Sequence, residues 1–195
     1  GSGRVDPYEA IHSSVNFQVV DETTTINNGE EVTIDERTGG MSFGLKYVDG
    51  KPLHEQRTIE ITNSGDKDKT FQASVEFTSK SLDASENDVS LSFTDKLTVN
   101  AGKSKKTKVF LNVPALAEKG YYEGYVTYVN SEDPSEEYQI PFGIRVSEEG
   151  IEALEAFNFS TKQNSQFGTI FNYTPGSFVL RSPMEKLSLV LVDPK

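Results

Sequence analysis

One pentapeptide in the sequence has the spacing of a serine nucleophile. Residues 40–44 read Gly-Met-Ser-Phe-Gly, which matches the G-x-S-x-G pattern of a serine exposed where a strand turns sharply into a helix. An alternating run continues to Tyr47 without a helical period, so the motif lacks that context. A catalytic triad would also need His12 or His54, the only histidines, as base, and neither lies in a recognisable motif. We therefore place Ser42 in a strand and predict no catalytic residue.

Acidic residues cluster in the polar segments, where they are candidates for binding calcium. The clusters are Glu30-Glu31, Glu132-Asp133, Glu136-Glu137 and Glu148-Glu149. Calcium needs about six to eight oxygen ligands, and the loop of an EF-hand, with its central glycine and terminal glutamate, is not present. The chain has no cysteine, which excludes disulfides and thiolate metal sites. We interpret the clusters as solvated turn charge, with a weak calcium site as the alternative, and predict no metal and no cofactor.

The only basic run contains Lys103, Lys105, Lys106 and Lys108. Lysines on a strand at the edge of a sheet prevent unwanted pairing with other chains, so we interpret the run as a turn and a protected edge strand. The functional alternative is a local contact with a polyanionic cell-wall polymer.

The segment 120–126, Gly-Tyr-Tyr-Glu-Gly-Tyr-Val, is the richest in candidate binding residues. If Tyr122 and Gly124 face a core, then Tyr121, Glu123 and Tyr125 face outward. A glycine at an inward position is expected where a neighbouring backbone or ring comes close. Tyr121, Glu123 and Tyr125 therefore form a possible docking surface for another domain, or the tyrosines form a platform for a sugar. Surface tyrosines without a role are the alternative.

Composition excludes several classes of function. The chain has 195 residues, with 19 Lys+Arg against 30 Asp+Glu, a formal net charge of −11. Nucleic-acid binding needs a basic face, which argues against such a partner. No stretch approaches 18 consecutive apolar residues, so a membrane span is not expected.

The elements that must position these residues are short strands. Between 41 and 147, seven or eight alternating runs are separated by turn residues, which is typical of a β-sandwich with immunoglobulin-like topology. The Cys–Trp–Cys core of immunoglobulin domains is absent, which favours a fibronectin-III-like sandwich. Pro141 lies inside the last run and lacks an N–H donor, so we expect it at a bulge or an edge.

The flanking segments are also interpreted from local patterns. Asp6, Pro7 and Glu9 have the spacing of a helix cap, which predicts a short helix over 7–13. Residues 14–40 are expected to form a hairpin or linker with a turn at Asn27-Asn28-Gly29. Four strand candidates in 148–195 indicate an incomplete second β-module: Phe157–Ser160, Phe167–Asn172, Phe178–Arg181 and Leu187–Val192. Its apolar strand faces predict self-association through 151–195, through Phe167, Ile170, Leu187, Leu189 and Leu191.

Two parts of the sequence resemble the subtilisin-like serine proteases. The pattern G-x-G-x-V-D-x-x-x-A over residues 1–10 is similar to the end of their catalytic domain. The segments 58–63 (TIEITN), 120–126 (GYYEGYV) and 140–142 (IPF) resemble the Fn3-like domain that follows it in lactocepins, streptococcal cell-envelope peptidases and the minor extracellular protease of bacilli. The two blocks occur in the same order and together span about residues 1–147.

The resemblance implies a C-terminal accessory region without chemistry of its own. The family's catalytic residues all lie upstream of its G-x-G stretch, so none of them corresponds to a position in this chain. We therefore expect 1–13 to be the tail of a catalytic domain, 14–40 a hairpin, 41–147 an Fn3-like sandwich and 148–195 the start of a second module. The expected role is to support the upstream catalytic domain and to position a protein substrate or cell-wall partner outside a Gram-positive cell. A surface adhesion or glycan-binding module is the alternative.

Overall fold

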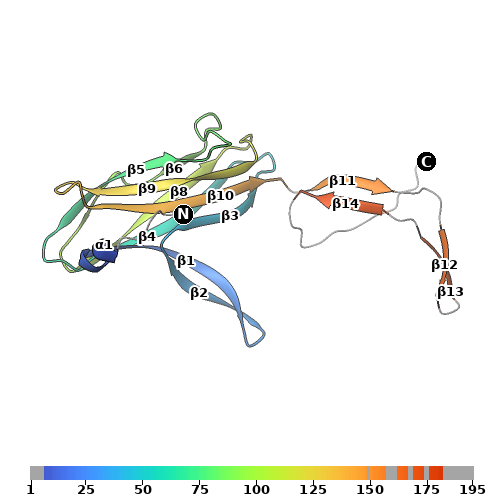
Figure 1. Ribbon diagram of the computed structural model, residues 1–195, viewed down its shortest axis with the longest axis horizontal. Coiled ribbons are helices and arrows are strands. Elements are labelled where there is room, and N and C mark those ends of the chain that lie inside the picture. The colour runs from blue at the N-terminus through green and yellow to red at the C-terminus, as the bar shows by residue number, and fades with distance from the viewer. Residues whose placement is uncertain (1–6, 149, 157–161, 167–168, 174–175, 182–195) are drawn as a thin grey trace. The chain divides into compact units, whose positions relative to one another are not determined.

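The computed structural model describes residues 7–148, 150–156, 162–166, 169–173 and 176–181 (Figure 1). The chain divides into two compact units, Gly1–Val146 and Ser147–Lys195. The pattern G-x-G-x-V-D begins in residues 1–6, which lie outside the described residues, as does the predicted cap Asp6.

The first unit is a sandwich of two five-stranded sheets, whose two layers are visible in Figure 1. The first sheet has the order β2-β1-β4-β8-β6, with β1 (Val15–Asn27), β2 (Glu30–Thr38), β4 (Leu53–Asn63), β6 (Ser90–Ser92) and β8 (Lys103–Val113). The second sheet has the order β3-β10-β9-β5-β7, with β3 (Met41–Tyr47), β5 (Lys69–Phe77), β7 (Lys96–Val99), β9 (Gly120–Asn130) and β10 (Glu137–Ser147). The predicted all-β sandwich is confirmed.

Side chains at alternate positions of the strands fill the space between the sheets. Ile59 and Ile61 of β4 and Phe71 of β5 are completely buried. The ring centroid of Phe17 lies 5.4 Å from that of Phe71, 5.0 Å from that of Tyr128 and 4.7 Å from that of Tyr138. Aromatic pairs at these separations contribute beyond their buried area, so this cluster ties β1 to the second sheet.

The segment ahead of residue 41 is joined to the sandwich. Helix α1 covers Pro7–His12, close to the expected 7–13. β1 and β2 form the expected hairpin, and Asn28 and Gly29 have the positive φ values, 53° and 86°, that a two-residue turn of this kind needs. We expected 14–40 to precede the sandwich, whereas Val15–Val20 pair with β4 inside the first sheet. The reason is that the alternating apolar side chains at the start of β1 are buried in the common core.

Two serines fix the point at which the chain enters the sandwich. The carbonyl oxygen of Ser14 accepts hydrogen bonds of 2.8 Å from both the backbone N–H and the hydroxyl of Ser64. The hydroxyl of Ser13 shares a hydrogen bond of 2.6 Å with the hydroxyl of Tyr138 on β10. Contacts from both sheets therefore hold the end of α1.

Pro141 occupies an inner strand, and the prediction of a bulge or an edge is wrong. β10 lies between β3 and β9, and its pairing with β9 runs through Pro141 and Tyr125 without a register shift. On its other side Pro141 lies against Gly40, the residue just before β3 begins. A proline is tolerated here because the neighbouring strand only starts at this position.

The second unit contains two small sheets in its described part. β11 (Ile151–Ala156) pairs with β14 (Gly176–Leu180), and β12 (Lys162–Gln166) pairs with β13 (Thr169–Tyr173). The strand candidates Phe157–Ser160 and Leu187–Val192 lie outside the described residues. Leu154, Phe178 and Val179 are exposed by 67%, 44% and 51%. Self-association through this unit stays a prediction.

The described residues contain no helix long and apolar enough to cross a membrane.

Candidate functional site

Strand β9 presents the predicted docking residues on the outer face of the second sheet. β9 pairs with β5 on one side and β10 on the other, so its backbone is held along most of its length. Tyr121 is 58% exposed, Glu123 is exposed and Tyr125 is half-buried, while Tyr122 and Gly124 are buried. The predicted alternation is confirmed, and the role of the outward residues as a docking surface stays a prediction.

A shallow hollow of about 550 Å³ lies beside Tyr121, and we call it the Tyr121 groove. Three of its lining positions are glycines (Gly40, Gly44 and Gly143), so backbone forms much of its wall. Gly44 has a φ of +71°, a conformation that residues with a Cβ rarely adopt. The remaining lining residues are Met41, Ser42, Tyr121, Tyr122, Glu123, Pro141, Phe142, Ile144 and Arg145.

Arg145 completes the polar side of the Tyr121 groove. It is the cross-strand partner of Tyr121, and its guanidinium carbon lies 5.4 Å from the centre of the Tyr121 ring. A cation over an aromatic face at this distance is attracted by the ring. Our sequence analysis missed Arg145, although it stands between the inward Ile144 and Val146, because the register that pairs it with Tyr121 is a tertiary property.

The inward tyrosines of β9 are structural. The hydroxyl of Tyr122 donates to the carbonyl oxygen of Glu118 at 2.8 Å, and burial, with a smaller effect of the Glu118 charge, raises the pKa of Tyr122. Burial raises the pKa of Tyr128 to about 12. Both phenols therefore stay protonated at neutral pH and have no role in acid–base chemistry.

The G-x-S-x-G motif lies in a strand, as predicted. Ser42 is exposed in β3, and its carbonyl oxygen accepts a hydrogen bond of 2.9 Å from Nε of Arg57. His54 lies in the first sheet, where its Nδ1 forms a hydrogen bond of 2.7 Å with the amide oxygen of Asn112. The fold thus puts the serine and this histidine in different sheets.

His12 lies at a small hollow of about 240 Å³ that Asp133, Ser135 and Glu136 also line. The hydroxyl of Ser135 donates to Asp133 at 2.6 Å, and this hydrogen bond is the main reason for the lowered pKa of that carboxyl. Glu136 accepts from Lys69 at 2.6 Å. The hydroxyl and the carboxylates of this hollow are therefore engaged in holding a turn and an ion pair.

Acidic residues outside the four clusters also hold turns. Asp68 accepts a hydrogen bond from the backbone N–H of Ala101, and Asp83 accepts from the hydroxyl and the N–H of Ser85. These bonds, led by the Ser85 hydroxyl, lower the pKa of Asp83. Within the residues that the structure describes, no three His, Cys, Asp or Glu side chains lie together as metal ligands would.

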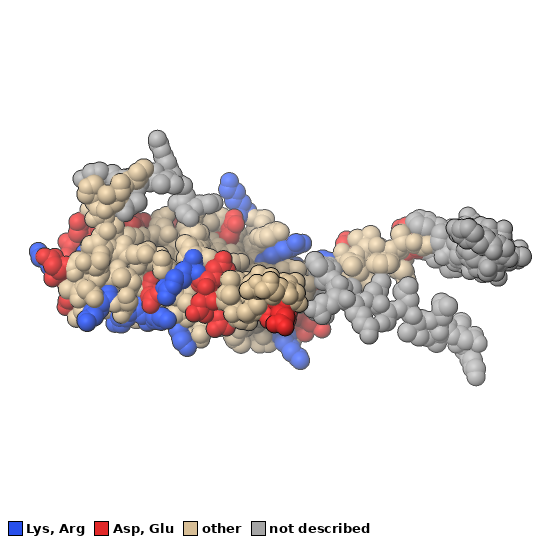
Figure 2. Space-filling model, turned by 90° about the horizontal axis from the view of Figure 1, so that it is seen from below, with Lys and Arg blue, Asp and Glu red and all other residues tan. Residues whose placement is uncertain are grey.

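The lysine run lies in β8, along a part of the strand that pairs only with β4 among the described residues and is therefore a local edge of the sheet, as predicted. β8 lies between β4 and β6, but β6 pairs only with Phe110–Asn112. Lys103, Lys105, Lys106 and Lys108 are all exposed along the preceding part. Figure 2 shows basic and acidic side chains intermixed on one face of the sandwich, without a continuous basic patch.

Comparison with solved structures finds similarity to parts of proteins of different function. A family 123 glycoside hydrolase from Clostridium perfringens superposes with a TM-score of 0.50 at 10% identity, covering 70% of this chain and 27% of the hydrolase. A FixG-related protein from Vibrio parahaemolyticus has a TM-score of 0.42 at 11% identity, covering 69% of this chain and 97% of its own. The secreted serine protease VesC from Vibrio cholerae has a TM-score of 0.40 at 7% identity, with 71% and 41% covered. At these identities the likeness shows the fold alone.

Comparison with curated proteins and with family models gives one match. No curated protein matches the chain. The model of the Fn3-like domain matches residues 45–143, which include β4 to β9, the end of β3 and most of β10. These residues form most of the sandwich described above, and they make up half of the chain. The chain therefore belongs to the Fn3-like domain family.

Proposed function

We propose that this chain is a non-catalytic accessory domain of a secreted or cell-envelope subtilisin-like serine endopeptidase. In this proposal the domain supports the catalytic domain through the Tyr121 groove and positions a protein substrate or a cell-wall partner. The observation that carries the proposal is the groove itself, where an exposed Tyr121, a paired Arg145 and backbone walls lie on an inner strand of a rigid sheet. Tyrosine and arginine are the residues that most often dominate binding energy at protein interfaces.

The preorganised geometry favours a protein partner. Both side chains of the Tyr121–Arg145 pair stand on paired strands, so little conformational entropy is lost when a partner orders them. The sequence resemblance of 58–63, 120–126 and 140–142 to the Fn3-like domain of subtilisin-like proteases supplies the identity of that partner as an upstream catalytic domain.

A glycan-binding or adhesion module is the second candidate, favoured by the flat, glycine-lined groove and the exposed ring of Tyr121. Against it, the guanidinium of Arg145 already covers one face of that ring. A sugar would have to displace Arg145 or use the opposite face of the ring.

The proposal is tested first by the coding sequence upstream of Gly1, which should encode the G-T-S-M-A-x-P segment of a subtilisin-like nucleophile. In the full-length protease, Tyr121→Ala with Arg145→Ala should lower the cleavage rate of a protein substrate about tenfold or reduce the thermal stability of the catalytic domain. Leu116→Ala is the matched control, since Leu116 is 93% exposed outside the groove. Unchanged protease behaviour, together with Tyr121-dependent binding of purified cell-wall glycan, would establish the second candidate instead.

A further inference from the structure

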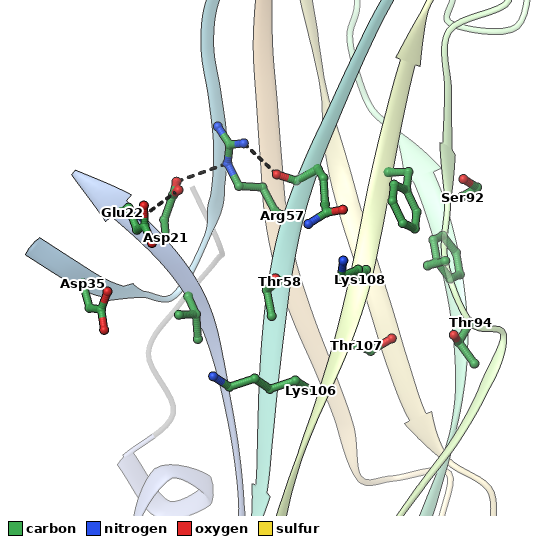
Figure 3. A pocket seen from close by; sticks show the side chains of 14 residues that line it. Asp21, Glu22, Asp35, Arg57, Thr58, Ser92, Thr94, Lys106, Thr107 and Lys108 are labelled. Carbon is green, nitrogen blue, oxygen red and sulfur yellow. Dashed lines mark hydrogen bonds and ion pairs between the residues drawn. The ribbon is translucent and has the colours of Figure 1, made fainter. Parts of the chain in front are cut away.

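The first sheet carries a second hollow, formed where the β1–β2 hairpin leaves the sandwich. β1 pairs with β4 only over Val15–Val20, while it pairs with β2 from Val19 to Asn27. Beyond Val20 the hairpin diverges from β4 and leaves a trough of about 1040 Å³ over the outer faces of β4 and β8. Figure 3 shows the hairpin on one side of this trough and β8 on the other.

The two sides of the trough carry opposite charge. Glu22 and Asp35 are direct cross-strand partners on the hairpin, and both are exposed. Lys106 and Lys108 lie two positions apart on β8 and are exposed on the same face. Figure 3 shows Lys108 on the far side of Thr58 from the two carboxylates, while the side chain of Lys106 extends from β8 toward β1. We call Glu22 with Asp35 the acidic wall and Lys106 with Lys108 the basic wall.

Glu22, Asp35 and Lys108 form no ion pair within the described part of the chain, while Lys106 is the cross-strand partner of Glu60, where the hydrogen bond from Arg37 and, to a smaller extent, the charge of Lys106 lower the pKa of that carboxyl. Other charged side chains nearby do form ion pairs: Arg37 pairs with Glu60, and Arg57 pairs with Asp21 at 3.1 Å. No ion pair with a described residue involves a side chain of either wall. Two carboxylates placed directly opposite each other on paired strands are destabilising, so the acidic wall costs stability that the fold does not recover.

The divergence of the hairpin is rigidly supported. Arg57 contacts Asp21 at the point of separation, donates to the carbonyl oxygen of Ser42 at 2.9 Å and lies 4.9 Å from the centre of the Phe43 ring. It thereby ties the base of the hairpin to both sheets. The walls are held apart by this anchor and are not free to collapse onto each other.

An apolar patch continues the trough past the basic wall. Phe110, two positions after Lys108 on β8, is 43% exposed, and the half-buried Phe93 lies beside it with Ser92 and Thr94. Across the strands the trough therefore presents an acidic, a neutral, a basic and an aromatic zone in that order.

We propose that this trough binds an extended peptide segment that carries a basic side chain, a short spacer, an acidic side chain and an apolar residue. The basic side chain meets the acidic wall, the acidic side chain meets the basic wall and the apolar residue packs on Phe110. Where β4 lies paired between them, β1 and β8 are two strand spacings apart, about 10 Å, and an extended peptide covers that distance in about three residues. The separation is larger at the acidic wall on the diverging hairpin, and a long basic side chain covers the difference. Charge complementarity selects a peptide of mixed charge over a polyanion, a polycation or a metal ion. The proposal needs no catalytic domain and uses the face of the sandwich that the Tyr121 groove does not use.

The test measures binding of a short fluorescent peptide with one arginine, two serines, one glutamate and one phenylalanine to the purified 195-residue chain by anisotropy. Glu22→Lys with Asp35→Lys should weaken binding at least tenfold, and so should Lys106→Glu with Lys108→Glu. The variant with all four substitutions should bind a peptide in which the arginine and the glutamate are exchanged, to within about threefold of the wild-type affinity, because the inverted walls accept the exchanged charges while the phenylalanine still meets Phe110. Circular dichroism and the urea midpoint establish that each variant is folded.

The test has matched control variants and outcomes that would overturn the proposal. Lys80→Glu and Glu86→Lys exchange exposed charges that do not line the trough and should leave binding unchanged. The proposal is overturned if the wild-type chain does not bind the peptide or if the folded fourfold variant does not bind the charge-exchanged peptide. It is also overturned if an all-glutamate peptide or calcium alone binds as tightly and depends on one wall only. None of these outcomes bears on the Tyr121 groove, so the accessory role would be judged separately.

Discussion

Both faces of strand β9 carry tyrosines, which are buried on one face and at least partly exposed on the other. The strand contains four tyrosines, of which Tyr122 and Tyr128 are completely buried, while Tyr121 is 58% exposed and Tyr125 is half-buried. The inward pair packs between the sheets, whereas the outward Tyr121 meets only Arg145 and the open groove. Burial on this strand is thus decided by the parity of the position and not by residue type. The comparison separates a face that maintains the fold from a face that is available for binding.

The largest effect is expected from filling the inward face at Gly124. A Cβ at this position would lie 2.0 Å from the carbonyl oxygen of Glu76 and 2.9 Å from Cζ of Phe142. Because the nearest atom belongs to the backbone of the neighbouring strand, the contact cannot be relieved by a side-chain rotation. Gly124→Ala should lower the free energy of unfolding by about 3 kcal/mol or more, measured by urea denaturation.

The control for this substitution is Gly143→Ala on β10, where a Cβ would meet no atom within 4 Å. Its effect should stay within about 0.5 kcal/mol. Equal losses at Gly124 and Gly143 would show that the close approach of β5 does not explain the glycine.

The second largest effect is expected at the buried Asn130, at the end of β9, and its partner Glu136. Asn130 is 5% exposed, and its amide donates to Oε2 of Glu136 at 2.6 Å, while Lys69 and Tyr138 donate to Oε1 at 2.6 and 2.8 Å. Burial by itself raises the pKa of Glu136, but these hydrogen bonds together lower it below the ordinary 4.5. The ionised carboxylate therefore stabilises the fold above the unfolded-state pKa, and this contribution is lost as the pH falls through the lower folded-state pKa.

Glu136→Gln should cost about 1.5–3 kcal/mol at pH 7 and much less at pH 3. Urea denaturation across this pH range measures the difference. In a Lys69→Met background the same substitution should cost clearly less, since the two side chains act as a pair. A cost that does not change with pH would mean that the shape of the side chain matters and its charge does not.

The smallest effect distinguishes the two buried tyrosines. The hydroxyl of Tyr122 has a partner in Glu118, whereas the hydroxyl of Tyr128 is buried with no hydrogen-bond partner among the described residues. Tyr122→Phe should therefore destabilise by about 1 kcal/mol, and Tyr128→Phe should be neutral or stabilise by about 1 kcal/mol. Thermal unfolding of both variants measures whether each substitution stabilises or destabilises the fold. A loss of stability in Tyr128→Phe equal to that in Tyr122→Phe would reveal a partner for the Tyr128 hydroxyl.

The sequence predicted much of the sandwich because period-two alternation is a local signal. The runs at 41–47, 71–77, 97–99 and 122–128 all fall in strands with the expected inward residues. Gly124 was interpreted correctly as a point of close approach, since a glycine in an inward row of large side chains leaves room for a neighbour.

Other features depended on which strands become neighbours. The patterns of Val15–Val20 and of the lysines of β8 fit several places in a sheet. Only the pairing with β4 decided where each segment lies. Arg145 gave no signal as a candidate residue, because its partner Tyr121 is distant in sequence. Glu22 and Asp35 pair within the predicted hairpin, but their position beside β4 and β8 depends on where that hairpin leaves the sheet.

The sequence by itself determined that the chain forms short strands, which side chains of each strand point inward, and where the hairpin turn of β1 and β2 must lie. These properties follow from side-chain alternation and from the conformations that asparagine and glycine allow. Only the tertiary structure decided the strand order, the place of Pro141 beside the start of β3, the Tyr121–Arg145 pair and the opposition of charged walls over β4. The reason is that each of these depends on strand neighbours and on their register, which are fixed by the joint burial of residues from distant parts of the chain.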